Sequence, residues 1–267
     1  MIETAAGATP EDDRPGLLTS RRGNVAVLTL NRPHIRNALN GAMLDALEER
    51  LTLIAEDDSL RAVVLTGAGT SFCSGEDLAV AKEGGETFAR SIRSLQRVTR
   101  LFFNLGKPVV GALNGPAVGG GLELALSCDV RLASPAFFCS TPETRLGLIL
   151  SNGASVLLPL LIGQSRARRM LFSGARMDAD WCHRAGLIDE IVPGDLQARA
   201  LEIAAELSSG GPLATAATRR LLNAPLYRAL TAALDDEEET CIDIQRTAEA
   251  AEGLAAYRGA REPSWRT

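Results

Sequence analysis

Two short apolar segments, "AVVLTG" at residues 62–67 and "PVVGAL" at residues 108–113, constrain the fold of this chain most strongly. Each is an almost unbroken apolar run that leads into a glycine-containing loop. Such runs are typical of strands buried on both faces, and a helix-like repeat separates the two. We therefore expect an α/β fold with a mostly parallel sheet, right-handed helical crossovers and a ligand site where the strands end. The apolar residues of the intervening helix are Ile92, Leu95, Val98, Leu101 and Phe102.

The flanking segments extend this pattern. Residues 16–33 contain two alternating apolar runs around a turn at residues 22–24, which predicts a hairpin. Asn40 is expected to cap the helix that follows, because Asn is a preferred residue at that position. From about residue 195 the strand-like runs stop, and the periodicity predicts amphipathic helices at 195–208, 212–223 and 226–250.

These patterns predict three parts of the chain. Residues 1–15 are expected to be a flexible tail, residues 16–194 the core, and residues 195–267 a helical region. The length of the last helices and the acidic run at residues 235–239 suggest packing on another surface, such as a neighbouring subunit. An autonomous helical cap is the alternative.

Composition and charge narrow the class of protein. The chain has 267 residues, of which 46% are hydrophobic, and a net charge of −5 with acids and bases mixed, so we expect no nucleic-acid partner. The N-terminus has acids where a signal peptide needs an apolar run, and no apolar stretch is long enough to predict a membrane span. The five cysteines form no C-x-x-C pair, and His34 and His183 lie far from any ligand cluster. We therefore expect a cytoplasmic protein without a bound metal.

The loops after the two strands can bring backbone groups close to a ligand. Their sequences are "TGAGTSFCSGEDLA" and "NGPAVGGGLELA". Glycine permits close approach of the backbone, and N–H groups at the start of a helix attract developing negative charge, so together the loops could form an oxyanion pocket. Neither loop has the spacing of a dinucleotide or phosphate loop, and the chain has no G-x-S-x-G serine elbow.

Two carboxylates remain as candidates for the chemistry. Glu123 lies in the first turn of an apolar helix, where burial raises its pKa and the helix N-terminus lowers it. Glu143 follows Pro142, and Ser140 or Thr141 can cap a helix there. Each residue has a structural alternative, because an acid in the first turn also satisfies the helix dipole. On separate loops at one sheet edge, the two could hold one water, one accepting a proton while the other donates.

Four motifs resemble, in order, the successive signatures of the enoyl-CoA hydratase/isomerase family, also called the crotonase family. The likeness runs from about residue 16 to "EGLAAYRGAREPSW" near the C-terminus. The four motifs are "NRPHIRNALN", "AVVLTGAGTSFCSGEDL", "KPVVGALNGPAVGGGLELALSCDVRLAS" and "TPETRLGLI".

The resemblance implies a spiral of repeated ββα units with a C-terminal helical region used in trimer formation, and a homo-oligomer that is a trimer or a dimer of trimers. It implies an acyl-CoA substrate and no cofactor. Carried over by position, Glu123 and Glu143 are the catalytic glutamates, and the backbone N–H groups of Glu76 and Gly120 form the oxyanion hole. The implied CoA contacts are Arg36, Asn37, Ala38, Leu39, Asp77 and Leu78.

The function expected from this resemblance is reversible hydration of a 2-enoyl-CoA. An enoyl-CoA isomerase and a non-catalytic acyl-CoA-binding protein are the alternatives. The chain departs from the family at Glu76, where a small or apolar residue is more usual, and at residues 151–153, where the loop after "LGL" differs. An additional carboxylate beside the pocket could repel an acidic acyl group or take part in proton transfer. Residues 78–96 are expected to form part of the acyl pocket.

Overall fold

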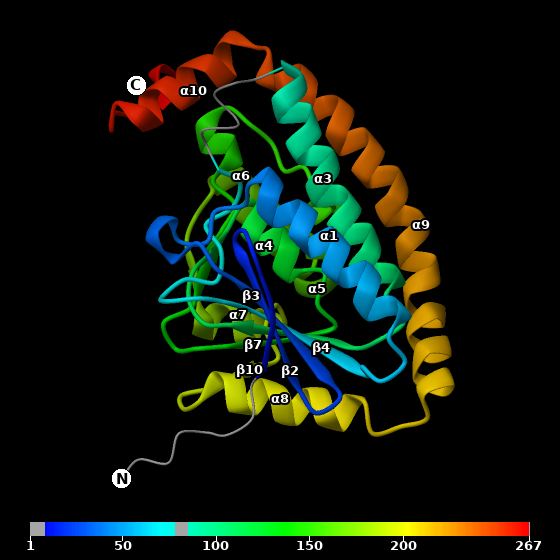
Figure 1. The fold of residues 1–267 in the computed structure, drawn as a ribbon. Helices are drawn as coiled ribbons and strands as arrows, with labels where there is room; N and C mark the ends of the chain where they lie inside the picture. The colour runs from blue at the N-terminus through cyan, green and yellow to red at the C-terminus, as the bar shows by residue number, and fades with distance from the viewer. Residues whose placement is uncertain (1–8, 78–84, 267) are drawn as a thin grey trace.

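A computed structural model describes residues 9–77 and 85–266, and in these residues a mixed sheet of seven strands forms the centre of the molecule (Figure 1). The strand order is β1-β2-β3-β4-β5-β7-β10. Strands β3, β4, β5, β7 and β10 are parallel, and β1, β2 and β3 are antiparallel neighbours. Both the predicted hairpin and the predicted parallel sheet are confirmed. The bounds are β1 Thr9–Arg14, β2 Leu17–Arg22, β3 Val25–Leu30, β4 Ala62–Gly67, β5 Val109–Leu113, β7 Val130–Ala133 and β10 Glu190–Ile191.

Helices cover both faces of this sheet. Helices α1 (Gly41–Glu56) and α3 (Gly85–Asn104) lie on one face, and α8 (Leu196–Leu207) lies on the other (Figure 1). Successive strand residues alternate between the two resulting cores, so Val64 belongs to the core with α8 while Leu65 belongs to the larger core. Burial on both faces explains why the strands are apolar without interruption.

A second, smaller sheet and several short helices carry the chain from β5 to the C-terminal region. The small sheet has the order β6-β8-β9. Its strands are β6 Ala117–Val118, β8 Phe138–Ser140 and β9 Met177–Asp178. The helices are α4 Gly120–Ala125, α5 Ala154–Ile162, α6 Gln164–Ser173 and α7 Ala179–Ala185, with 3-10 turns at Pro33–Ile35, Glu143–Leu146 and Ser264–Arg266.

The C-terminal helices differ from the prediction. Helix α9 runs without a break from Pro212 to Gln245 along α3, and α10 (Ala248–Arg258) follows it (Figure 1). The predicted interruption at residues 224–225 is therefore wrong. Pro225 is an exposed residue inside α9, so its ring faces outward while buried residues such as Leu230 keep the helix on the core. The chain breaks instead at Thr247, whose side chain accepts a hydrogen bond from the Ala250 N–H and caps α10.

The N-terminal segment also differs from the prediction. Residues 9–14, which fall in the predicted flexible tail, form strand β1 and pair with β2. The alternation that would have indicated a strand is missing, since the segment is "TPEDDR". The strand is defined by its backbone pairing with β2, which requires no alternation in the sequence.

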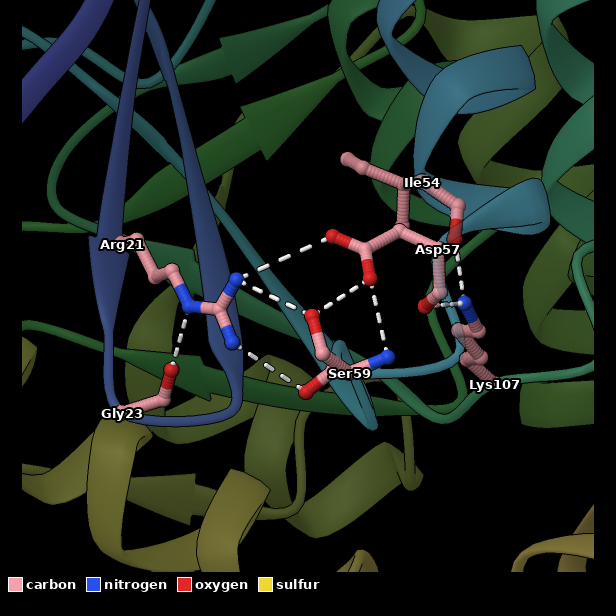
Figure 2. Close-up of polar contacts among 6 residues, drawn as sticks. All are labelled: Arg21, Gly23, Ile54, Asp57, Ser59 and Lys107. Atoms are coloured by element: carbon pink, nitrogen blue, oxygen red, sulfur yellow. Dashed lines mark hydrogen bonds and ion pairs between the residues drawn. The ribbon is translucent and has the colours of Figure 1, made fainter.

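Polar contacts fix the hairpin to the end of α1 (Figure 2). Arg21 donates to the Ser59 hydroxyl at 3.1 Å and forms an ion pair with Asp57 at 3.7 Å. Hydrogen bonds from the Ser59 side chain and backbone lower the pKa of Asp57. Lys107 donates to the Asp57 carbonyl at 2.7 Å and so satisfies a carbonyl at the end of α1.

Among the described residues, no helix has the length and apolar character needed to cross a membrane.

Candidate active site

The loops that follow β4 and β5 lie against each other. Cys73 pairs with Ala117 as an isolated parallel bridge, and the Val118 N–H donates to the Cys73 carbonyl at 3.0 Å. Leu39 forms a second bridge with Glu76, which brings the segment before α1 to the same place. The two predicted glycine loops therefore meet where the parallel strands end, as expected.

Glycines make this close approach possible. A Cβ on Gly75, whose φ is +93°, would lie 2.7 Å from the Val118 carbonyl oxygen. A Cβ on Gly121 would lie 2.4 Å from the Cys73 carbonyl oxygen. Both distances are far below contact, so any larger residue would force the loops apart.

The backbones of Glu76 and Gly120 lie close together in this region. A Cβ built on Gly120 would lie 3.6 Å from the Glu76 nitrogen, and Gly120 is the first residue of α4. Neither N–H donates a hydrogen bond to another of the residues in 9–77 and 85–266. Two adjacent donors at a helix start are an arrangement that can stabilise an oxyanion.

Glu123 is buried and held by a distant loop. Its side chain is 2% exposed, and Oε1 accepts the backbone N–H groups of Ser151 at 3.2 Å and Asn152 at 2.9 Å. Burial raises its pKa well above the usual value, and the negative charges of Glu237 and Glu143 raise it further. The hydrogen bonds to residues 151 and 152 show that its carboxyl group is fixed by the loop after Leu150.

Glu143 lies next to Gly119 of the glycine loop. It begins the 3-10 turn Glu143–Leu146, and its Oε1 would lie only 2.5 Å from a Cβ on Gly119. Burial raises the pKa of Glu143 to about 7. The predicted cap is wrong, because Pro142 takes the capping position without a side-chain hydrogen bond. Thr141 instead donates its hydroxyl to the Met170 carbonyl at 3.2 Å.

Glu76 is a third carboxylate in the same cavity. Its Oε1 accepts the Ser91 hydroxyl of α3 at 3.3 Å, and burial raises the pKa of Glu76 to about 7. The cavity has a volume of about 330 Å³ and is lined by Glu76, Glu123 and Glu143. Its apolar lining residues are Phe88, Val118, Pro142, Leu146, Leu148, Ile149, Cys241 and Tyr257, and Ser74, Arg145 and Ser151 are polar lining residues. Of the predicted acyl-pocket segment, Phe88 lines the cavity, whereas residues 78–84 lie outside the described residues.

The sequence model of the enoyl-CoA hydratase/isomerase family matches residues 20–267, nearly the whole chain. This chain belongs to the enoyl-CoA hydratase/isomerase family. The resemblance seen in its four motifs is thereby confirmed.

Similar members of the enoyl-CoA hydratase/isomerase family agree with this assignment. The putative enoyl-CoA hydratase/isomerase YngF of Bacillus subtilis is 36% identical, over 92% of this chain and 95% of that protein. The 2,3-dehydroadipyl-CoA hydratase of Escherichia coli is 35% identical, over 94% of this chain and 98% of that protein. A crystal structure of an enoyl-CoA hydratase from Mycobacterium avium subsp. paratuberculosis matches with a TM-score of 0.86 at 30% identity, covering 94% of this chain and 99% of that chain. The predicted crotonase-like α/β fold is confirmed.

Four of the six residues expected to contact CoA, at positions 36–39, form one segment beside the loop that follows β4. The Asn37 side chain is fully buried and donates to the carbonyls of Ser71 at 2.8 Å and Phe72 at 3.1 Å, so it holds the loop. Ala38 and Leu39 are also buried, whereas Arg36 is exposed with a φ of 56°.

The other two predicted CoA contacts lie at the end of the same loop. Arg32 donates to the Ala38 carbonyl at 2.8 Å and pairs with Asp77 at 3.3 Å, which ties that end to the segment before α1. Leu78 lies outside the described residues.

Sequence reasoning missed Glu237. This residue of α9 is 6% exposed and raises the pKa of Glu123, yet it lies in the acidic run that suggested a subunit surface. The spacing of Glu237 from neighbouring apolar residues is a sequence pattern that indicates its burial. Residues 230, 234, 237 and 241 follow a helical spacing and are all buried, so an acid at the third of them occupies a core position.

Proposed function

We propose that this chain catalyses the reversible hydration of a 2-enoyl-CoA thioester to a 3-hydroxyacyl-CoA. The observation that carries the proposal is one apolar cavity that contains Glu123 and Glu143 beside the adjacent N–H groups of Glu76 and Gly120. Membership of the enoyl-CoA hydratase/isomerase family supports the same class of substrate.

The two N–H groups act on the thioester carbonyl. When water adds at the β-carbon, negative charge moves onto the carbonyl oxygen, and fixed donors stabilise that charge more than they stabilise the ground state. Since the role at Glu76 belongs to its backbone, the unusual side chain leaves this oxyanion hole intact. Removing one such donor typically costs on the order of 3 kcal/mol of transition-state stabilisation.

The two carboxyl groups act on the water. One carboxylate accepts a proton from the attacking water as its oxygen bonds to the β-carbon, and the other carboxyl group, protonated, donates its proton to the α-carbon as the enolate collapses. Burial raises the pKa of both carboxyl groups, and a pKa of about 7 suits Glu143 to proton exchange near neutral pH. Addition of water to a double bond is not a net oxidation or reduction. The proposed reaction therefore requires no redox cofactor.

Glu76 favours an uncharged acyl group. Its side chain adds a third carboxyl group to the cavity, and a negative charge on the acyl chain would be repelled there once Glu76 ionises. We expect crotonyl-CoA to be hydrated faster than an enoyl-CoA that ends in a carboxylate, with the ratio of kcat/KM falling towards one in Glu76→Gln. An unchanged ratio would contradict this role.

The CoA portion is proposed to lie along residues 36–39 and 77–78, with Arg36 as the phosphate partner because it is exposed beside the glycine loop.

We further propose a trimer or a dimer of trimers, assembled through the region 195–267. Exposed apolar residues on α9, including Leu213, Leu221 and Leu222, support an interface there. Free cysteines at all five positions support a cytoplasmic location.

Product analysis in D2O separates hydration from isomerisation. With a 2-enoyl-CoA, the proposal predicts a 3-hydroxyacyl-CoA that carries one deuterium at the α-carbon. With a 3-enoyl-CoA, it predicts little conversion to the 2-enoyl isomer. Conversion of the 3-enoyl-CoA without hydration of the 2-enoyl-CoA would favour an isomerase, and CoA binding without turnover of either would favour a binding protein.

A further inference from the structure

A buried glutamate from the C-terminal region caps a helix beside the cavity. Oε2 of Glu237 accepts the Gly153 N–H at 2.6 Å, and Oε1 accepts the Ser155 N–H at 3.1 Å together with the Ser155 hydroxyl. These groups lie at the N-terminus of α5, where Gly153 occupies the capping position and has no side chain to supply an acceptor. Glu237 thus acts as the missing cap from a different element, α9.

The segment capped in this way is the one that holds Glu123. The N–H groups of Ser151 and Asn152 donate to Oε1 of Glu123, and the next N–H along the chain, that of Gly153, donates to Glu237. Two buried carboxylates therefore bind three successive backbone N–H groups. Any movement of one carboxylate displaces the donors of the other, because a peptide unit is planar and stiff.

Helices α3 and α9 also contact residues 151–153. Gln96 donates to the carbonyls of Ser151 and Leu234, both at 2.8 Å. A Cβ on Gly153, whose φ is +86°, would lie 2.3 Å from Leu230. The loop at residues 151–153 thus packs directly on α9, and its position depends on that helix.

We propose that Glu237 is a positioning residue for Glu123, acting through the Ser151–Asn152–Gly153 backbone and through its own charge. This inference rests on the proposed hydratase function, in which Glu123 exchanges a proton with substrate or water. It assigns a catalytic consequence to the C-terminal helix α9, beyond any role in subunit assembly.

The charge of Glu237 acts on Glu123 together with other acids. Glu143 and Glu76 face Glu123 across the cavity, and all three neighbours raise the pKa of Glu123. On the outer side of α9, Asp235 pairs with Arg100 and Glu238 pairs with Arg93, so those charges are balanced. Burial also raises the pKa of Glu237 itself, so its repulsion acts at pH values where Glu237 is ionised. At those pH values, removing the charge at residue 237 lowers the pKa of Glu123.

The test compares Glu237→Gln and Glu237→Ala with the parent enzyme. We expect kcat for crotonyl-CoA to fall about 10- to 100-fold in Glu237→Ala, the range that a small misplacement of a reacting group produces, with KM within about threefold. In Glu237→Gln we expect a smaller loss of kcat and a shift of the pH profile of kcat to lower pH.

Two variants serve as controls. Asp236→Asn removes an exposed acid from the neighbouring position of α9, and it should leave kcat and the pH profile unchanged. Ser155→Ala removes one donor to Glu237 while keeping its charge and both backbone hydrogen bonds, so it should cost about twofold in kcat without the shift to lower pH. Urea unfolding of each variant identifies any general loss of stability.

An infrared titration makes the inference independent of turnover. The carboxyl band that disappears in Glu123→Gln belongs to Glu123, and its midpoint should move to lower pH in Glu237→Gln. If crotonyl-CoA is not hydrated but the midpoint moves, the proposed function fails while the coupling stands. An unmoved midpoint and an unmoved pH profile, or a kcat unaffected by Glu237→Ala, would overturn the inference.

Discussion

At the residue scale, the three glycines at 119–121 each satisfy a different spatial requirement. Gly119 has a φ of +53° and lies beneath the Glu143 carboxylate. Gly120 presents its N–H next to that of Glu76, and Gly121 passes close to the Cys73 carbonyl. The run that precedes Glu123 is thus required by contacts to two separate segments, the loop after β4 and the turn that begins at Glu143.

Gly119→Ala tests the link between this run and Glu143. The new Cβ would lie 2.5 Å from Glu143 Oε1 and would require a backbone conformation that only glycine adopts readily, so Glu143 must move. We expect kcat to fall by about 100-fold. Gly41→Ala is the matched control, because a Cβ there meets nothing within 4 Å and its activity should be unchanged. Full activity in Gly119→Ala would contradict this account of Glu143.

Glu143→Gln tests the cost of burying this carboxyl group. Burial raises the pKa of Glu143 from 4.5 to about 7, so its contribution to stability is present below pH 4.5 and is lost as the pH rises through about 7. The variant should match the parent in free energy of unfolding at pH 4 and exceed it by up to about 3 kcal/mol at pH 8.

Urea unfolding at the two pH values measures this difference for Glu143→Gln. The exposed acid Glu239, changed to Gln, provides the control and should show no such pH dependence. A difference that does not change between the two pH values would show that burial does not disfavour the charge of Glu143.

Sequence alone could place some of these residues and not others. The burial of Glu123 followed from its apolar helix, and the meeting of the two loops followed from the parallel strands. The partners of Glu123 could not be predicted, because its donors come from residues 151 and 152, which the fold brings close without any sequence pattern.

At the element scale, the strands were easier to predict than the C-terminal helices. Strands 62–67 and 108–113 are buried on both faces, so composition alone identifies them. Helix α9 packs along α3 and α5 on one side and exposes Pro225 on the other. Local propensity at Pro225 favours a break, but the contacts on both sides of it along the helix outweigh the loss of one hydrogen bond.

Pro225→Ala tests this balance. A proline inside a helix removes one hydrogen bond and crowds the preceding turn, so its replacement should raise the free energy of unfolding by up to about 3 kcal/mol. Pro212→Ala is the control, because Pro212 lies at the start of α9, where no N–H partner is lost, and no gain is expected. Thermal unfolding measures both. An equal effect of the two substitutions would show that Pro225 is not strained in α9.

At the scale of the whole molecule, the cavity joins distant parts of the chain. Its three carboxylates follow β4, β6 and β8, and Cys241 and Tyr257 of the C-terminal helices contribute to its lining. The resemblance of the motifs to a known family indicated Glu123, Glu143 and the position of Glu76, because these residues lie within the matching motifs. It did not indicate Cys241 and Tyr257, since α9 and α10 reach the cavity only through tertiary packing.

The central claim is that Glu123 and Glu143 together hydrate an enoyl thioester, and the most direct test is the loss of enoyl thioester absorbance when the protein is mixed with crotonyl-CoA. The account predicts loss of the band with the parent enzyme and a rate about 10²- to 10⁴-fold lower in Glu123→Ala and in Glu143→Ala, the range for removing a general acid or base. Glu239→Ala, at an exposed site, should retain the parental rate. Hydration at the parental rate in either cavity variant would contradict the claim.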